Sequence, residues 1–404
     1  QVSRRDFVKN TLLASTAGTL ASHQILATEH QTKNLIPATE GAILHWLTGQ
    51  APSVLQGTTW GIPWPKGLVK KETPLAVLQN DIVQNSQTWP LAFWPDGSVK
   101  WSAFAIGAQE KLAENWRVKI GQKPQAGKLQ VNESQDIIVV DTGKMRCEIA
   151  KKGNTIIKSL FHAQQKLVAQ NGKLILQVQN QADGDWAENT QLQGFESTIQ
   201  KVQIENQGSV RALIKVEGIH QSTQGKQLLP FVLRLYFYEN SDSIRAIHSF
   251  VYDADENHDF IKGIGFRFDT LLKDTALYNR HIRFVGQNGG VFAEAIQGLT
   301  GLRRNPGKDA TQSQFEGKSV NTLPQNIQEL LKYIPAFGDY TLFQGSCDGF
   351  DIQKRTKAGY GWIQSASGQR ASGLAYLGTP TGGLSLGLRH FWQSYPAQID
   401  IRQA

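Results

Sequence analysis

Alternation of apolar and polar residues over long runs restricts this chain to β structure more than any other feature of its sequence. Every second residue from Phe231 to Phe237 is apolar and would share one face of an extended strand, whereas Arg234 would lie on the other face. A period of two places one face of a strand against a core. Further strand-like apolar runs occupy residues 137–140, 145–149, 174–178, 210–216, 244–251, 260–268 and 373–388. This succession predicts a large two-sheet β-sandwich over residues 131–404.

The region before this sandwich is dominated by tryptophan. Seven of the ten tryptophans lie between Trp46 and Trp116. Pro95-Asp96-Gly97-Ser98 is a turn sequence, because proline presets φ and Asp-Gly suits a tight hairpin. We therefore predict a compact β domain over residues 41–130. A small domain needs large apolar anchors, so we expect most of these tryptophans in its core, with sugar stacking as the alternative.

The first residues match an export signal. Ser3-Arg4-Arg5-Asp6-Phe7-Val8-Lys9 precedes a weakly apolar stretch, as in a twin-arginine signal. We expect a signal peptide over residues 1–27 and a polar linker over residues 28–40; an amphipathic first helix is the alternative. A run of about 18 apolar residues is missing, so we expect no membrane span after signal removal. The expected location is periplasmic or extracellular.

The positive charge is spread along the chain. The formal charge of +8 comes from 42 Lys and Arg against 34 Asp and Glu, and no block of five basic residues occurs. Nucleic-acid-binding proteins usually concentrate their charge in a stripe, so we expect no nucleic-acid partner. A mildly basic protein suits an acidic polymer such as a uronic-acid polysaccharide, and a generic solvated surface is the alternative.

Several enzyme classes have no motif here. The sequence holds no Gly-x-Ser-x-Gly, P-loop or His-Glu-x-x-His, which leaves serine hydrolase, NTPase and zincin activities without support. Cys147 and Cys347 are the only cysteines. They allow one disulfide in an exported protein without implying it, and they exclude a cysteine-based zinc site.

Two tryptophan motifs carry a family resemblance. Trp60-Gly-Ile-Pro-Trp-Pro-Lys-Gly67 and Trp89-Pro-Leu-Ala-Phe-Trp-Pro-Asp-Gly-Ser-Val-Lys-Trp101 resemble motifs of the exo-rhamnogalacturonan lyase family, polysaccharide lyase family 26. Residues 251–256, 354–356 and 391–396 resemble parts of the second domain of that family. The similarity covers most of residues 40–404.

The resemblance implies an all-β fold. It would consist of a small RIFT-barrel-like domain followed by a large galactose-mutarotase-like β-sandwich. Family members then continue into an (α/α) toroid, and no helical repeat occurs in this sequence. We therefore expect a protein without the toroid, either as a fragment of a larger lyase or as a naturally shorter protein.

The implied reaction is β-elimination at a galacturonosyl bond of a pectic glycan. It needs a base, a positive group that neutralises the carboxylate, and an acid for the leaving oxygen. We take Lys354, Arg355, His248 and Arg245 as catalytic candidates. Arg245 and His248 are three residues apart, so on a regular strand they would point to opposite faces. A buried, hydrogen-bonded structural role is the alternative for His248.

Cations next to aromatic residues suggest where an anionic sugar would bind. A cation can meet the carboxylate while a ring stacks on the pyranose. The candidates for substrate binding are Tyr360, Trp362, Arg389 and Trp392. Ordinary packing and surface charge are the alternative.

A calcium site is a weaker prediction. Asp253 and Asp255 copy the first ligand positions of a calcium loop, but His258 and Ile264 replace the Gly and Glu of an EF-hand, which is excluded. A looser Ca²⁺ site at these aspartates is an alternative to a solvated acidic turn, and no other cofactor is expected.

Together these features predict an exported protein that acts on an acidic plant-type polysaccharide or oligosaccharide. A non-catalytic carbohydrate-binding or scaffold module is the alternative function. A mutarotase-like epimerase is a third class, for which the fold is the only argument.

Overall fold

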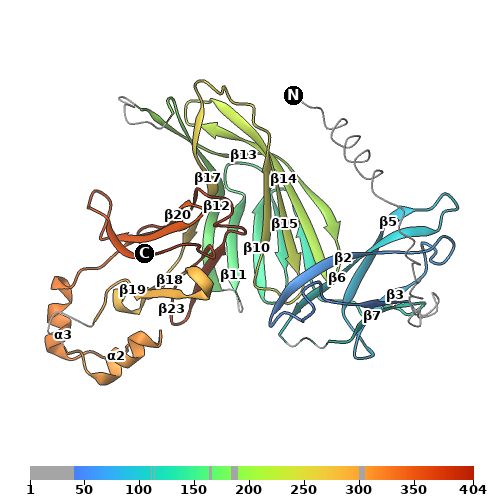
Figure 1. The fold of residues 1–404 in the computed structure, drawn as a ribbon, viewed down its shortest axis with the longest axis horizontal. Helices are drawn as coiled ribbons and strands as arrows, with labels where there is room; N and C mark the ends of the chain where they lie inside the picture. The colour runs from blue at the N-terminus through green and yellow to red at the C-terminus, as the bar shows by residue number, and fades with distance from the viewer. Residues whose placement is uncertain (1–40, 111, 113, 163–165, 183–189, 300–304) are drawn as a thin grey trace, which may run out of the picture.

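The computed structural model describes residues 41–110, 112, 114–162, 166–182, 190–299 and 305–404 (Figure 1). The predicted signal peptide (residues 1–27) and linker (28–40) lie outside these residues. Strands form nearly all of the regular structure, as the alternation predicts. In the described part of the chain, no helix is long and apolar enough to cross a membrane.

The first domain consists of two small sheets that enclose a tryptophan-rich core. One sheet has the order β1 (Ala42–Leu44), β7 (Trp116–Ile120), β3 (Leu75–Gln79) and β4 (Ile82–Val83), and the other has the order β2 (Leu55–Pro63), β6 (Val99–Gln109) and β5 (Ser86–Phe93). Trp64 and Trp116 are buried in the core between them, as expected. The core expectation is wrong for Trp101, which is 40% exposed. Its indole lies over Gly61 of the neighbouring strand, where any side chain would collide with it.

The predicted hairpin turn joins β5 to β6. Asp96 Oδ1 accepts hydrogen bonds from the backbone N–H of Ser98 (3.0 Å) and from its hydroxyl (2.6 Å). Gly97 adopts a φ of 82°, a left-handed value that favours glycine. These contacts fix the turn, although the pairing of the two strands next to it is irregular near Ala92.

The central part of the molecule is one ten-stranded antiparallel sheet. Its strands are β8 (Gln130–Glu133), β9 (Ile137–Asp141), β10 (Met145–Ala150), β11 (Ile157–His162), β12 (Lys166–Gln179), β13 (Leu192–Gln207), β14 (Arg211–Ser222), β15 (Gln227–Tyr238), β16 (Arg245–Phe250) and β17 (Phe260–Thr270). The first half of β12 pairs with β11 and its second half with β13, while β17 runs along it as well. The sheet therefore divides at β12 into two layers.

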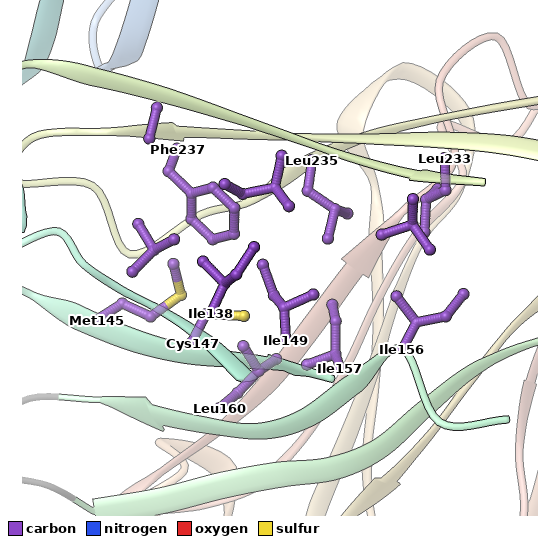
Figure 2. Packing of buried hydrophobic residues seen from close by; sticks show 14 of the residues in the cluster. Ile138, Met145, Cys147, Ile149, Ile156, Ile157, Leu160, Leu233, Leu235 and Phe237 are labelled. Atoms are coloured by element: carbon purple, nitrogen blue, oxygen red, sulfur yellow. The ribbon is translucent and has the colours of Figure 1, made fainter. Parts of the chain in front are cut away.

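The main core lies between these two layers. Figure 2 shows Ile138, Cys147 and Ile149 of β9 and β10 facing side chains of β15. The alternating residues Phe231, Leu233, Leu235 and Phe237 are all buried, as their period of two predicts.

The last part of the chain forms a second, smaller sandwich with its own core. One sheet has the order β19 (Val291–Ala295), β18 (His281–Val285), β23 (Leu374–Thr379) and β24 (Gly382–Gly387), and the other has the order β22 (Ile363–Gly368), β21 (Gly349–Arg355), β20 (Asp339–Ser346) and β25 (Ala397–Ile401). Phe284, Tyr340, Leu342 and Phe391 are buried between them. The two largest buried clusters of residues 131–404 therefore lie in the central layers and in this smaller sandwich.

Short helical segments border this smaller sandwich. They are α2 (Lys308–Phe315), α3 (Gln325–Leu330), and the 3₁₀ turns η1 (Leu277–Asn279), η2 (Gln287–Gly289) and η3 (Leu331–Tyr333). The two cysteines are free thiols. Cys147 is buried in the main core and Cys347 is exposed in the turn between β20 and β21, so they form no disulfide.

The first domain packs against the central sheet through a buried carboxylate. The side chain of Asn85 donates to both oxygens of Glu239 at 3.1 Å, and the N–H of Lys128 donates to Oε1 at 2.7 Å. Nearby, the hydroxyls of Thr59 and Tyr238 are 3.0 Å apart. These contacts fix the position of β2, β5 and β6 against β14 and β15.

Candidate functional site

Two of the catalytic candidates, Lys354 and Arg355, end strand β21 of the smaller sandwich. The ammonium of Lys354 pairs with Glu294 and lies 4.2 Å from the centre of the Phe337 ring. The guanidinium of Arg355 pairs with the buried Asp339 at 2.7 Å. A protein carboxylate therefore already neutralises each cation, and a substrate carboxylate would have to compete with it.

Beside them, Trp362 lies between two arginines. Its ring centre is 4.5 Å from the guanidinium of Arg355 and 5.0 Å from that of Arg402. Tyr360 is exposed, with the Lys357 ammonium 5.2 Å from its ring centre. The predicted neighbourhood of cations and rings around Lys354 and Arg355 therefore exists, although its charges are largely paired.

The third catalytic candidate, His248, lies among aromatic rings on the inner face of β16. His220, Phe231 and Phe250 surround it, with ring centres 5.7, 6.0 and 5.7 Å away. Burial lowers the pKa of His248 to about 4, and the neighbouring His220 adds to this effect. His248 is consequently uncharged near neutral pH, and its Nε2 atom has no hydrogen-bond partner in the described structure. The structural alternative, a buried and hydrogen-bonded histidine, is met only in part, because His248 is half-buried and its Nε2 has no partner among the described residues.

The fourth candidate, Arg245, points to the opposite face of the same strand. The pairing of β15 with β16 has no register shift, so residues three apart alternate regularly, as the spacing predicts. The guanidinium of Arg245 lies 5.6 Å from the ring centre of Tyr236 on the outer face. The structure therefore places the four catalytic candidates in three separate surroundings and on two different sheets.

The two aspartates of the calcium prediction serve a turn. Asp253 Oδ1 accepts from the N–H of Leu229 at 2.7 Å, and Asp255 accepts from the N–H of Asn257 at 2.9 Å and contacts His258 at 3.0 Å. Among the described residues, no group of three His, Cys, Asp or Glu side chains could hold a metal ion. This arrangement supports the solvated acidic turn and gives the calcium site no support.

A cleft of about 480 Å³ brings together cationic, aromatic and amide groups at one end of the smaller sandwich. Arg370, Trp392, Gln287, His390 and Gln393 contribute to its lining. The guanidinium of Arg370 lies 4.5 Å from the ring centre of Trp392. The predicted Arg389 is exposed immediately before His390, at the edge of this cleft.

The segments that line the cleft are fixed by packing against the core of the smaller sandwich. Phe391 is buried in the core of the smaller sandwich and anchors the segment that carries Trp392. Gly373 lies so close to the Phe391 ring that a side chain there would collide with it. On the other side, the N–H of Gln369 donates to Gln287 Oε1 at 3.2 Å. Trp392 and Arg370 are thus presented by two well-packed segments.

Sequence reasoning identified Trp392 but missed Arg370. Arg370 pairs with Asp348 at 2.8 Å, and both side chains are more than half exposed. No local motif marks Arg370, because its partner Trp392 arrives from a segment after the next two strands. Only the pairing of sheet strands brings the two residues together.

Comparison with known proteins agrees with the fold. Residues 40–121 match the PcRGLX-like N-terminal RIFT barrel domain, and residues 129–404 match the PcRGLX-like protein central beta sandwich domain. These are the two β domains that the resemblance to exo-rhamnogalacturonan lyases implied.

The individual proteins that resemble this chain are longer than it is, and the chain covers less than half of each of them. The uncharacterized protein YetA of Bacillus subtilis (strain 168) is 34% identical over 366 residues, which cover 89% of this chain and 42% of YetA. An alpha-mannosidase from Enterococcus faecalis V583 has a TM-score of 0.38 at 8% identity, over 90% of this chain and 41% of the mannosidase. A glycosyl hydrolase family 38 protein from Enterococcus faecalis has a TM-score of 0.40 at 7% identity, over 90% and 42%. Such low TM-scores say nothing about function.

The two domain matches cover nearly all of the described chain, and their boundary falls between the first domain and the central sheet. The chain therefore belongs to the PcRGLX-like family and carries its N-terminal RIFT barrel and its central β-sandwich.

Proposed function

We propose that this chain is the glycan-binding β portion of a rhamnogalacturonan-lyase-like protein and that it binds an acidic pectic glycan in the cleft of Arg370 and Trp392. The observation that carries the proposal is the guanidinium of Arg370 held against the indole of Trp392 at the wall of an open cleft. A uronate sugar offers both matching groups, a carboxylate for the cation and an apolar ring face for the indole.

The ion pair between Arg370 and Asp348 does not prevent this binding. Because both side chains are more than half exposed, the pair contributes little stability. A ligand carboxylate bound in the cleft can therefore replace Asp348 as the partner of Arg370. The amide side chains of Gln287 and Gln393 can donate hydrogen bonds to sugar hydroxyls at the same wall.

Elimination by this chain is the second candidate, favoured by the family and by the uncharged His248. Its weakness is geometric, since His248, Arg245 and the Lys354–Arg355 pair do not meet in the described structure. We therefore assign binding to this chain and leave elimination to the longer proteins of the family, as part of the same proposal. Export by the twin-arginine route, which would bring the protein to such glycans, belongs to this proposal as well.

The test is the binding of rhamnogalacturonan I and polygalacturonan to purified residues 28–404, measured by affinity electrophoresis or calorimetry. Trp392→Ala and Arg370→Gln should each weaken binding by about tenfold or more, since each removes one of the two recognised groups. Arg283→Gln is the matched control, because it removes an arginine that lies over another ring, Tyr376, outside the cleft. If Trp392→Ala and Arg370→Gln bind the glycans as tightly as the wild type does, the cleft is not the binding site.

The same incubations distinguish the two candidate functions. Unsaturated uronates absorb near 235 nm, so a rising absorbance that Lys354→Ala removes would establish elimination by this chain. A flat absorbance together with binding that needs Trp392 is the result we expect.

A further inference from the structure

A stack of rings and guanidinium groups runs across the junction between the first domain and the central sheet. The guanidinium of Arg211 lies 5.0 Å from the ring centre of Trp89 and 5.3 Å from that of Tyr236. The guanidinium of Arg245, on strand β16, lies 5.6 Å from the centre of the same Tyr236 ring. We call these four residues the junction stack; they come from β5, β14, β15 and β16.

Strand register accounts for the stack. Leu233, Leu235 and Phe237 face the main core, so Tyr236 between them faces outward, and its partner Arg245 faces outward with it. Trp89 reaches the stack from the first domain, where it packs with Tyr238 at the buried contact between the two units. The junction stack therefore exists only where the two domains meet.

Among the residues that the structure describes, the two arginines of the stack have no counter-ion. Neither Arg211 nor Arg245 pairs with a carboxylate of the described chain, although Arg211 is only 6% exposed and its Nε atom has no hydrogen-bond partner there. A buried cation without a partner is costly, and stacking on rings offsets only part of that cost. Arg234, on the same outer face, shows the ordinary structural case, with Nε 2.9 Å and Nη2 3.2 Å from the carboxylate of Glu205.

We propose that the junction stack is a second site for an acidic sugar, with Arg245 at its exposed entrance and Arg211 deeper inside. The ligand carboxylate supplies a counter-ion for the exposed Arg245, and Arg211, on the strand at the other side of Tyr236, adds to the positive charge of the site. Trp101 lies on the same sheet face as Trp89, and its exposed indole offers a surface for a pyranose ring. The inference takes the class of ligand, an acidic glycan, from the proposed function, but its location is independent of the Arg370 cleft.

The experiment is calorimetric titration of purified residues 28–404 with a galacturonate oligosaccharide, using a neutral galactose oligosaccharide as a reference. We expect two acidic-sugar sites in the wild type. Arg245→Gln should abolish one of them or weaken it by about tenfold or more, because an exposed arginine can be replaced without disturbing the core. Arg234→Gln, on the same face, is the charge-matched control and should keep both sites.

A second variant tests the buried member of the stack. Arg211→Lys keeps the charge but loses the planar group that stacks between the rings, so it should weaken the same site. If this variant does not fold, Arg245→Gln alone decides the question.

The possible results separate the two proposals. Loss of one site in Arg245→Gln, with the other lost in Arg370→Gln, supports both. Loss in Arg245→Gln with full binding in Arg370→Gln supports the junction stack and refutes the cleft. Unchanged stoichiometry and affinity in Arg245→Gln overturns the junction site and leaves the stack with a structural role.

Discussion

At the scale of single residues, what separates a structural arginine from a binding one is its counter-ion. Arg355 and Arg234 each pair with a protein carboxylate, whereas Arg211 and Arg245 lie over aromatic rings and have no carboxylate partner among the described residues. Arg370 is intermediate, since its partner Asp348 is exposed and exchangeable. Arginines that look alike in the sequence therefore differ in how readily they could bind an anionic ligand, and the difference lies in their partners in the folded chain.

The histidine pair on the inner face of the sheet predicts loss of stability in acid. Burial lowers the pKa of His220 and brings the pKa of His248 to about 4, so protons bind more readily to the unfolded chain, where a histidine titrates near 6.5. The contribution of these groups is complete above about pH 6.5 and declines as the pH falls toward 4, by at most about 1.4 kcal/mol per pH unit for each histidine.

Urea unfolding at several pH values measures this decline. Because carboxylates also titrate in this range, the informative quantity is the difference between the wild type and His248→Leu. The variant should lose stability less steeply between pH 6.5 and pH 4. Parallel curves for both proteins would show that His248 does not contribute.

The two cysteines should differ sharply in reactivity. Burial raises the pKa of the Cys147 thiol, and its side chain lies in the main core, whereas Cys347 is exposed. We expect a thiol reagent to modify one cysteine rapidly in the native protein and the second only after denaturation. Cys347→Ser should abolish the rapid phase, and a rapid phase that persists in this variant would contradict the buried position of Cys147.

At the scale of elements, strand β15 shows how a pattern of period two becomes packing. Leu233, Leu235 and Phe237 face the main core opposite β9 and β10 (Figure 2). Phe231 belongs to the same core, whereas Arg234 and Tyr236 face outward. The same strand thus supplies core anchors on one face and members of the junction stack on the other.

Adjacent residues of β15 should therefore respond very differently to truncation. Leu233→Ala removes a buried side chain of the main core and should lower the free energy of unfolding by about 2–5 kcal/mol. Arg234→Ala removes a partly exposed ion pair and should cost less than about 1 kcal/mol. Chemical denaturation of both variants makes the comparison, and similar losses would mean that β15 does not separate a core from solvent in this way.

At the scale of the whole molecule, the first domain and the central sheet meet through buried polar contacts as well as through apolar packing. Glu239 is almost fully buried and accepts from Asn85 and Lys128. The junction stack depends on this contact, because Trp89 must be held against Arg211. Rigid docking of the two domains is thus a condition for the second proposed site.

Replacing Glu239 should weaken that docking. Glu239→Ala leaves buried donors without an acceptor and should lower stability by about 1–3 kcal/mol. Glu110→Ala, which removes an exposed carboxylate paired with Lys144, is the control and should have little effect. Thermal unfolding gives the stabilities, and calorimetry should show the junction site weakened in Glu239→Ala while the Arg370 cleft keeps its affinity.

Much of the fold could be predicted from local patterns. The period of two identified β15 as a half-buried strand, Pro95–Ser98 marked a hairpin, and the tryptophan motifs pointed to the family whose two β domains the chain contains. The opposite orientation of Arg245 and His248 also followed from spacing alone. These features depend on neighbours in the chain, and backbone geometry links such neighbours directly.

The composition of the candidate sites depended on tertiary structure. The sequence by itself determined an all-β protein with a tryptophan-rich first domain, and it named Trp392 and Arg245 as residues of interest. Only the folded chain decided that Trp392 meets Arg370, that Arg245 joins Arg211 around Tyr236, and that Lys354 is already paired with Glu294. The physical reason is that a side chain's partners are set by strand register and by the packing of layers, which join residues far apart in the chain and leave no local trace in the sequence.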